Sequence, residues 1–420
     1  MRILFATYSE KSHLFSMVPL AWAFRAAGHE VRIASNPELE GAITRTGLTA
    51  VPVGHDHDLW RVLQTVLGAT RWAQVPPFDA ADVPSEELTW ERLRAGYEMI
   101  VPWWFQLINE AIGGELIEFC RSWEPDLVVW EPTTYVGAVA AEAVGVPHVR
   151  TTLGVDVHGR LREEFVRLRD DHGLGPKDDP LASWLARVAD AAGVEYTERL
   201  TLGYATIDQL PSAFRLPSGI TYVPMRYVPY NGPSAVDAWL REPPSRPRVG
   251  ISLGLTASDR GARIPLPVRE IVRELAGLDV EVVAAPVTDG TDMPVNVRCR
   301  DFVPLHALAP TCAVMVHHAG FGSTATSSLY RLPQLAIPSQ LEAPSMARVL
   351  DALGVGLRID QEAATPGRVR AEVERLLTDP TFGAAAARLG DEMSAMPTPT
   401  DVVPALLELA RQGQRSAPAT

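Results

Sequence analysis

The sequence is short of several residue types, and each shortage excludes a class of function. Lysine is almost absent: Lys11 and Lys177 are the only two among 420 residues. A Schiff-base lysine or a P-loop lysine is therefore not expected, and no G-x-x-x-x-G-K-[ST] string occurs. Cysteine is limited to Cys120, Cys299 and Cys312, whose spacing is not that of metal ligands. These cysteines indicate buried thiols in a reducing compartment.

Long apolar runs and basic blocks are also missing. The N-terminal apolar run is shorter than that of a signal peptide, and no window approaches the ~18 uninterrupted apolar residues of a membrane span. We therefore expect a cytoplasmic protein with no membrane partner. The net charge is −13 and no basic block occurs, so nucleic acid is not expected as a partner either.

What the sequence does contain is an alternation of apolar strands and helices that occurs twice. Apolar strands are predicted at 2–7, 30–35, 126–131 and 147–152, and again at 248–253, 279–285, 313–318 and 334–338. Strands buried on both faces are typical of a parallel sheet. The chain is therefore predicted to be an α/β protein with two doubly wound sheets.

The domain organisation follows from this alternation and from a break in it. Residues 225–247 are rich in Pro, Gly and Ser, as is typical of a linker. We predict an N-terminal domain at 1–224, this linker, a C-terminal domain at 248–412 and a frayed tail at 413–420. The aromatic-rich segment from about His55 to Trp123 fits either a helical core or a wall lining an apolar acceptor cleft.

The stretch "AVMVHHAGFGSTATSS", residues 313–328, joins a strand to a helix expected from about Ser323. Adjacent histidines on a strand point to opposite faces, so at most one of His317 and His318 faces a ligand. Small residues allow close approach of the backbone, and the N–H groups of the helix favour an anion such as a diphosphate. The alternative to anion binding is an ordinary strand–helix turn in which the glycines only relieve steric strain.

Two further residues lie at predicted strand ends. His13 is expected in the loop after the first strand, where doubly wound sheets bind ligands and where a histidine can act as a base; the alternative is a surface loop histidine. Glu131 is the last residue of the predicted strand "DLVVWE". It is either a functional carboxylate or a residue at a helix start that interacts with the helix dipole. Asp156 is a weaker acidic candidate near the same predicted cleft.

Several segments together resemble a known family. "DFVPLHALAPTCAVMVHHAGFGSTAT…LPQLAIP", "SHLFSMVPLAWAFRAAGHEVRIAS", "PDLVVWEPTTYVGAVAA" and "YVPYNGPS" are similar to glycosyltransferases of the GT-B fold. The similarity is greatest to bacterial enzymes that attach deoxysugars to macrolide and aromatic polyketide antibiotics, and it covers nearly the whole chain. It implies two Rossmann-like domains facing a central cleft.

The resemblance assigns roles to residues of the donor site. His318 is the histidine expected to contact the diphosphate, and Phe302 and Val303 are expected to frame the nucleobase. The remaining diphosphate contacts are expected from Gly320, Gly322, Ser323, Thr324 and Thr256. In the same family His13 corresponds to the general base, and Glu131 corresponds to a carboxylate that orients this base in many relatives.

The sugar-binding segment departs from the pattern of relatives that use ordinary hexoses. Those relatives carry Asp followed by Gln, whereas this chain has Glu342 and Ala343 in "IPSQLEAPSMAR". Without the Gln side chain the site has less capacity to hydrogen-bond ring hydroxyls, which fits a donor sugar that lacks some of them. "Glu-Ala-Pro" resembles the "Asp-Ala-Pro" of amino-deoxysugar transferases, and a carboxylate could pair with a sugar ammonium. The alternative is sequence drift with a solvated Glu342.

The implied function is inverting transfer of a deoxysugar, with an amino group suggested by Glu342, from a thymidine diphosphate (dTDP) donor to an apolar polyketide aglycone. His13 removes the acceptor proton, and no cofactor or metal ion is expected. A homodimer and an auxiliary activator protein stay open as partners. Two rival functions are a catalytically silent nucleotide-binding or scaffold relative and a sugar-nucleotide epimerase.

Overall fold

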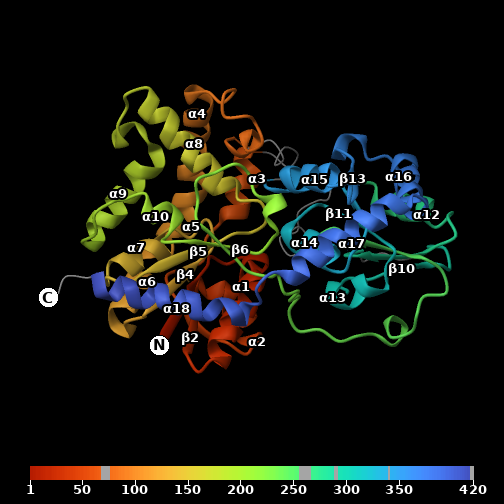
Figure 1. Cartoon of the computed structure of the whole chain (residues 1–420), viewed down its shortest axis with the longest axis horizontal. Coiled ribbons are helices and arrows are strands. Elements are labelled where there is room, and N and C mark those ends of the chain that lie inside the picture. Colours follow the sequence, from red (N-terminus) through yellow and green to blue (C-terminus); the bar gives the residue numbers. More distant parts are fainter. Residues whose placement is uncertain (68–75, 255–265, 288–291, 339–340, 417–420) are drawn as a thin grey trace.

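The computed structural model describes residues 1–67, 76–254, 266–287, 292–338 and 341–416. Two parallel sheets organise these residues, one in each half of the chain (Figure 1). Helices lie on the faces of both sheets, which explains why the strands are apolar along their whole length. The predicted α/β class with two parallel, doubly wound sheets is confirmed.

The first sheet has seven strands in the order β3-β2-β1-β4-β5-β6-β7. They are β1 (Arg2–Ala6), β2 (Glu30–Ser35), β3 (Thr49–Pro52), β4 (Leu127–Trp130), β5 (His148–Thr151), β6 (Thr206–Asp208) and β7 (Tyr222–Pro224). The strand order reverses between β1 and β4, which pair in parallel. The carboxyl edge at such a reversal is where open α/β sheets bind ligands.

The helices of this half are α1 (Lys11–Ala26), α2 (Glu40–Arg45), α3 (Leu59–Leu67), α4 (Trp90–Ile100), α5 (Leu107–Glu110), α6 (Gly113–Trp123), α7 (Val136–Glu142), α8 (Val157–Asp171), α9 (Pro180–Ala192) and α10 (Arg199–Leu202). The prediction that His13 lies in a loop is wrong, because α1 begins at Lys11 after the extended residue Glu10. His13 therefore projects from the first turn of a helix, which fixes its backbone.

The second sheet has six strands in the order β10-β9-β8-β11-β12-β13. They are β8 (Arg248–Ser252), β9 (Glu281–Ala285), β10 (Val297–Cys299), β11 (Val314–His317), β12 (Gln334–Ala336) and β13 (Gly356–Arg358). The helices are α12 (Val268–Leu275), α13 (Leu305–Leu308), α14 (Phe321–Leu329), α15 (Ala343–Ala352), α16 (Pro366–Thr378), α17 (Pro380–Ala395) and α18 (Pro399–Ser416). Helix α14 begins at Phe321, two residues before the expected start.

The last helix returns to the first half of the molecule. Figure 1 shows α18 lying beside α1, and Val402, Leu406 and Ala410 share a buried cluster with Leu14 and Phe24. The apolar side of α18, within the predicted C-terminal domain at 248–412, thus packs on the N-terminal half. The helix continues to Ser416, into the predicted tail, and residues 417–420 lie outside the described part.

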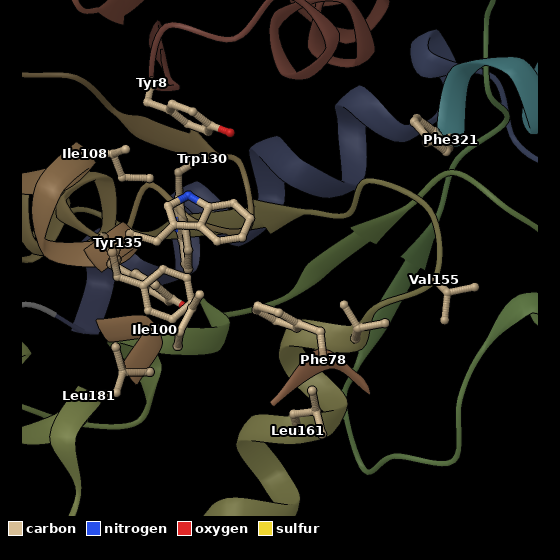
Figure 2. Packing of buried hydrophobic residues seen from close by; sticks show 14 of the residues in the cluster. Tyr8, Phe78, Ile100, Ile108, Trp130, Tyr135, Val155, Leu161, Leu181 and Phe321 are labelled. Carbon is tan, nitrogen blue, oxygen red and sulfur yellow. The ribbon is translucent and has the colours of Figure 1, made fainter. Parts of the chain in front are cut away.

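The two halves share an apolar interface. Phe321, Met346 and Leu350 belong to the same buried cluster as Tyr8, Phe78 and Trp130 of the first half (Figure 2). Polar contacts add to it, because Asp82 accepts a hydrogen bond from the Ser345 hydroxyl at 2.5 Å and pairs with Arg348. Helix α15 is thereby fixed against the N-terminal half.

The aromatic segment is largely buried, as its core interpretation predicted, and the acceptor-wall interpretation stays a prediction. Phe78, Trp90, Tyr97, Trp104 and Phe105 are buried in the shared cluster. Trp103 is exposed, and Trp72 lies outside the described residues. A π-helical segment, Val101–Gln106, carries Trp104 and Phe105.

Candidate active site

The reversal point of the first sheet brings two predicted residues together. Ala6 at the end of β1 pairs with Trp130 at the end of β4, so the segments after these strands lie side by side. Glu131 directly follows β4 and is fully buried. His13 approaches it from the first turn of α1, and His13 Nδ1 lies 2.8 Å from Glu131 Oε2.

The pKa values of this pair indicate mutual charge stabilisation. Burial lowers the pKa of His13, but the charge and hydrogen bond of Glu131, with smaller contributions from Glu10 and Glu342, raise it above its ordinary value. Burial likewise acts to raise the pKa of Glu131, but His13 and neighbouring hydroxyls outweigh this and lower it. Glu131 is therefore ionised and ready to stabilise an imidazolium.

Hydrogen-bond donors occupy both oxygens of the Glu131 carboxylate. Thr133 donates through its backbone N–H to Oε2 at 3.2 Å and through its hydroxyl to Oε1 at 2.9 Å. The Thr134 hydroxyl donates to Oε1, and His13 Nδ1 reaches Oε2. A carboxylate has about four lone-pair sites. These donors therefore occupy Glu131 and leave no site for a proton.

The direction of the Thr134 hydroxyl is fixed by the backbone. Its oxygen accepts the Tyr8 N–H at 3.1 Å, so its single proton is available to Glu131. Sequence reasoning identified neither Thr133 nor Thr134. The available signal was the pair of hydroxyl residues in "WEPTT", just after the acidic residue at a strand end.

The ionised carboxylate determines which nitrogen of His13 carries the lone pair. Glu131 accepts from Nδ1–H, so the lone pair of the neutral imidazole is on Nε2. Nε2 faces the Tyr8 hydroxyl at 3.4 Å, and the two rings meet edge to face at 4.9 Å. This geometry allows Nε2 to accept a proton from a hydroxyl at the sheet edge.

The residues predicted to bind an anion lie at the end of β11 and the start of α14. His317 is fully buried, with Nε2 at 2.8 Å from Gln334 Oε1 and Nδ1 accepting the Ala319 N–H at 3.0 Å. His318 is on the other side of the strand, and its buried Nδ1 has no hydrogen-bond partner among the described residues. The two histidines therefore separate as the strand alternation predicted: one is held by the protein and the other has an unused nitrogen.

Two glycines make room for the His318 ring. A Cβ on Gly320 would lie 2.2 Å from His318 Nε2, and one on Gly254 would lie 2.7 Å from its Cε1. Burial lowers the pKa of His318, so its imidazole is neutral and can donate one hydrogen bond. Gly320 is the N-cap of α14, so the ring lies next to the N–H groups of a helix start.

The other predicted diphosphate residues belong to the same helix start. Gly322 and Ser323 lie in the first turn of α14, and the Ser323 hydroxyl is 3.3 Å from that of Ser252. The buried Thr324 hydroxyl has no hydrogen-bond partner. Thr256 lies outside the described residues.

The predicted nucleobase residues differ in exposure. Phe302 is 39% exposed, so its ring is available to a ligand. The neighbouring Val303 side chain is 6% exposed and packs with Leu240, Val283 and Leu308. Only the backbone of Val303 is thus suited to the recognition predicted for it.

The predicted sugar residues begin α15. Glu342 is its N-cap and Ala343 its first residue. Desolvation raises the pKa of Glu342 to about 7, and the charge of His13 acts against this shift. A Cβ on Gly154 of the N-terminal half would lie 3.4 Å from Glu342 Cγ. Glu342 therefore reaches the boundary between the halves, on the side of His13.

Asp156 makes structural contacts within the N-terminal half. It caps α8 by accepting the Gly159 N–H at 2.9 Å, pairs with Arg150, and accepts the Tyr222 hydroxyl at 3.1 Å. Its acceptor contact stays a prediction.

The described residues contain neither a metal-ligating cluster nor a membrane-spanning helix. No group of three or more His, Cys, Asp or Glu side chains there is arranged to hold a metal ion. Within the same described part, no helix combines the length and apolar character needed to cross a membrane.

Comparison with known proteins identifies relatives along the whole chain. The 10-deoxymethynolide desosaminyltransferase of Streptomyces venezuelae is 41% identical, over 99% of this chain and 98% of that protein. The 3-alpha-mycarosylerythronolide B desosaminyl transferase of Saccharopolyspora erythraea is 40% identical, over 98% of both. A crystal structure of the glycosyltransferase VinC in complex with dTDP has a TM-score of 0.85 and 39% identity, covering 98% of this chain and 100% of that one.

The two parallel sheets and these relatives define a glycosyltransferase of the GT-B fold. The sequence-based resemblance to antibiotic deoxysugar transferases is confirmed. The chain belongs to the erythromycin biosynthesis protein CIII-like family, whose N-terminal domain model matches residues 22–254 and whose C-terminal domain model matches residues 269–409.

Proposed function

We propose that this chain transfers an amino-deoxysugar from a dTDP donor to a hydroxyl of a macrolide-type aglycone, with inversion at the anomeric carbon. The observation that carries the proposal is the buried His13–Glu131 pair, with Glu342 of the other half acting on the same histidine. The relatives support the substrate classes, since two are named desosaminyl transferases and VinC was solved with dTDP.

The chemical step is a displacement in which His13 is the base. The acceptor oxygen forms a bond to the anomeric carbon while the bond from that carbon to the diphosphate oxygen breaks. The acceptor proton moves to His13 Nε2, and the bonding electron pair leaves with the diphosphate. Glu131 stabilises the resulting imidazolium through Nδ1. Attack opposite the leaving group inverts the configuration.

The leaving diphosphate is stabilised at the start of α14. Its N–H groups and dipole favour an anion, and His318 Nδ1, which has no partner among the described residues, donates to the diphosphate in the tautomer that carries the proton on Nδ1. The Ser323 and Thr324 hydroxyls lie at the same helix start. These groups stabilise charge that develops as the bond to the sugar breaks.

Replacing His318 by alanine is expected to weaken dTDP binding by about tenfold, because a hydrogen bond to a charged group is lost. Titration calorimetry with dTDP measures this change. His172→Ala is the matched control, because His172 lies at the end of α8, where its Nδ1 contacts the Leu168 carbonyl. Equal dTDP affinity in wild type and His318→Ala would contradict the diphosphate role.

Glu342 is expected to discriminate donors by their amino group. Glu342→Gln should lower kcat/KM by about tenfold for a dTDP-amino-deoxysugar and much less for its deaminated analogue, since only the former loses an ion pair. The pKa of Glu342 is raised to about 7. The ionised form increases with pH, so the preference of wild type for the amine should rise as pH increases through about 7. Equal losses for both donors would exclude the ammonium contact.

The proposed mechanism needs no metal ion, because the start of α14 and His318 stabilise the charge of the leaving diphosphate. Removal of metal ions tests this part of the proposal. Turnover after treatment with EDTA should stay within about twofold of the untreated rate, because these groups supply the charge stabilisation. Added Mg²⁺ should not increase it. Loss of turnover that only a divalent cation restores would show that the proposal omits a metal.

The proposed function is tested by mass spectrometry of products. The purified chain is incubated with dTDP-linked deoxysugars and the aglycones in the names of the relatives, 10-deoxymethynolide and tylactone, with and without a related activator protein. Transfer predicts an aglycone heavier by one sugar and an equal amount of dTDP. An epimerase instead predicts an isomerised donor without any aglycone, and a silent relative predicts an unchanged donor.

A further inference from the structure

His158 lies at the same sheet edge as the proposed base but has no part in the proposed step. It is the second residue of α8, which follows β5, the neighbour of β4. Asp156 caps this helix and pairs with Arg150, so the first turn that carries His158 is firmly held. The carboxyl ends of β1, β4 and β5 thus present His13, Glu131 and His158 along one edge.

An aromatic wall surrounds His158. The centroid of its ring is 4.8 Å from that of Phe78, 6.1 Å from that of Phe105 and 6.4 Å from that of Trp104. Figure 2 shows Phe78 near Leu161 of α8, in the cluster that also contains Tyr8 and Trp130. Trp104 and Phe105 come from the π-helical segment, a local irregularity common at functional sites.

Two polar groups of this wall have no hydrogen-bond partner within the part of the chain that the structure describes. The Trp104 side chain is 5% exposed, and its buried Nε1–H makes no hydrogen bond. The half-buried His158 ring makes none with a described residue. Burial lowers the pKa of His158 to about 4, so the ring is neutral and offers one donor and one acceptor. The buried indole N–H of Trp104 is costly unless a ligand or water satisfies it, whereas the partly exposed His158 ring is open to either.

Unused polar groups of this kind recur at the donor site. His318 Nδ1 and the Thr324 hydroxyl are also buried without a partner, and both lie where the diphosphate is proposed to bind. Other buried histidines are satisfied by the protein, as His317 is by Gln334 and His148 is by Trp130. Trp104 therefore shares a buried, unpaired polar atom with the donor site, as do Ser35 and Trp184 elsewhere in the described residues, and Trp104 differs from those two in lying beside the unpaired His158 ring.

We propose that His158 and Trp104 form an acceptor-recognition site that binds an oxygen of the aglycone other than the hydroxyl that becomes glycosylated. This inference rests on the proposed function and deepens it. Phe78, Phe105 and the indole supply an apolar surface, and the two unpaired groups select a carbonyl or second hydroxyl held in it. The ligand is thus an apolar ring compound with at least two oxygens, oriented by one while the other faces His13.

The test uses substitutions that keep a ring and remove the nitrogen donors: Trp104→Phe and His158→Phe. Trp184→Phe is the matched control, because Trp184 is 1% exposed and its Nε1 is also unpaired, but it packs against Tyr135. Binding of 10-deoxymethynolide is measured by calorimetry in the absence of the donor. Where a variant turns over, initial rates also give KM for the aglycone and KM for the donor. An analogue with its carbonyl reduced to methylene reports on the selected oxygen.

We expect each of the two variants to weaken aglycone binding by about fivefold to tenfold, with donor KM unchanged. Wild type should prefer the aglycone to its reduced analogue, and the variants should lose this preference. Unchanged aglycone affinity in both variants, equal weakening in Trp184→Phe, or no binding by wild type would overturn the inference. Aglycone binding that depends on both residues without any sugar transfer would instead overturn only the proposed function.

Discussion

His13→Ala is expected to lower kcat by about 10²–10⁴-fold, the range that a positioned general base contributes. The physical reason is that Nε2, whose lone pair is fixed by the Nδ1 contact to Glu131, is the proposed proton acceptor. The dTDP site lies on the other half of the chain, so dTDP affinity should stay within about twofold, well below the loss expected for a direct contact. Initial rates and calorimetry measure the two quantities separately.

The control for this experiment is His172→Ala, which removes a histidine from the end of α8 in the same half of the chain. It should leave both turnover and dTDP affinity at wild-type values. If His13→Ala retained turnover within about threefold of wild type, the general base would have to be another group, since loss of a base costs far more.

Glu131→Gln is expected to lower kcat by roughly 10²-fold and to shift the pH profile of kcat/KM. In wild type the base must be neutral, so activity rises with pH through the pKa of His13, which Glu131 raises above 6.5. Without the carboxylate charge, burial is left as the main influence and lowers this pKa. The rising limb of the profile should therefore move to lower pH, although the maximum rate falls.

The direction of this shift separates the proposed role from simple misfolding. A variant that is only partly folded would lose rate at every pH and leave the pKa of the rising limb unchanged. Glu131→Asp is the conservative comparison, since it retains the charge and should keep the limb near its wild-type position. A limb that moves to higher pH in Glu131→Gln would contradict the charge pairing of Glu131 and His13.

The sequence predicted much of this site because strand ends can be recognised locally. The apolar strands before Glu131 and before His318 placed both residues at sheet edges, and the alternation along β11 separated His317 from His318. The start of α1 was missed because "SEKSH" is polar and lacks a recognisable helix signal, yet the structure begins the helix at Lys11. His13 therefore has a firmer backbone than a loop would give it.

Other features depend on contacts between distant segments, which a single sequence does not reveal. The apolar side of α18 is evident, but nothing local indicates that it packs on α1. Thr134 matters because the Tyr8 N–H, 126 residues away, fixes its hydroxyl. The contacts of Asp156 to Arg150 and Tyr222 are likewise not evident from the sequence.

The most direct test of this account is the anomeric configuration of the transferred sugar, measured by NMR on the glycoside formed from a dTDP-amino-deoxysugar of known configuration. Displacement with His13 as the base requires attack from the face opposite the diphosphate. The account predicts a glycoside of inverted configuration, formed in equal amount with dTDP. A glycoside of retained configuration, or hydrolysis of the donor without glycoside, would contradict it.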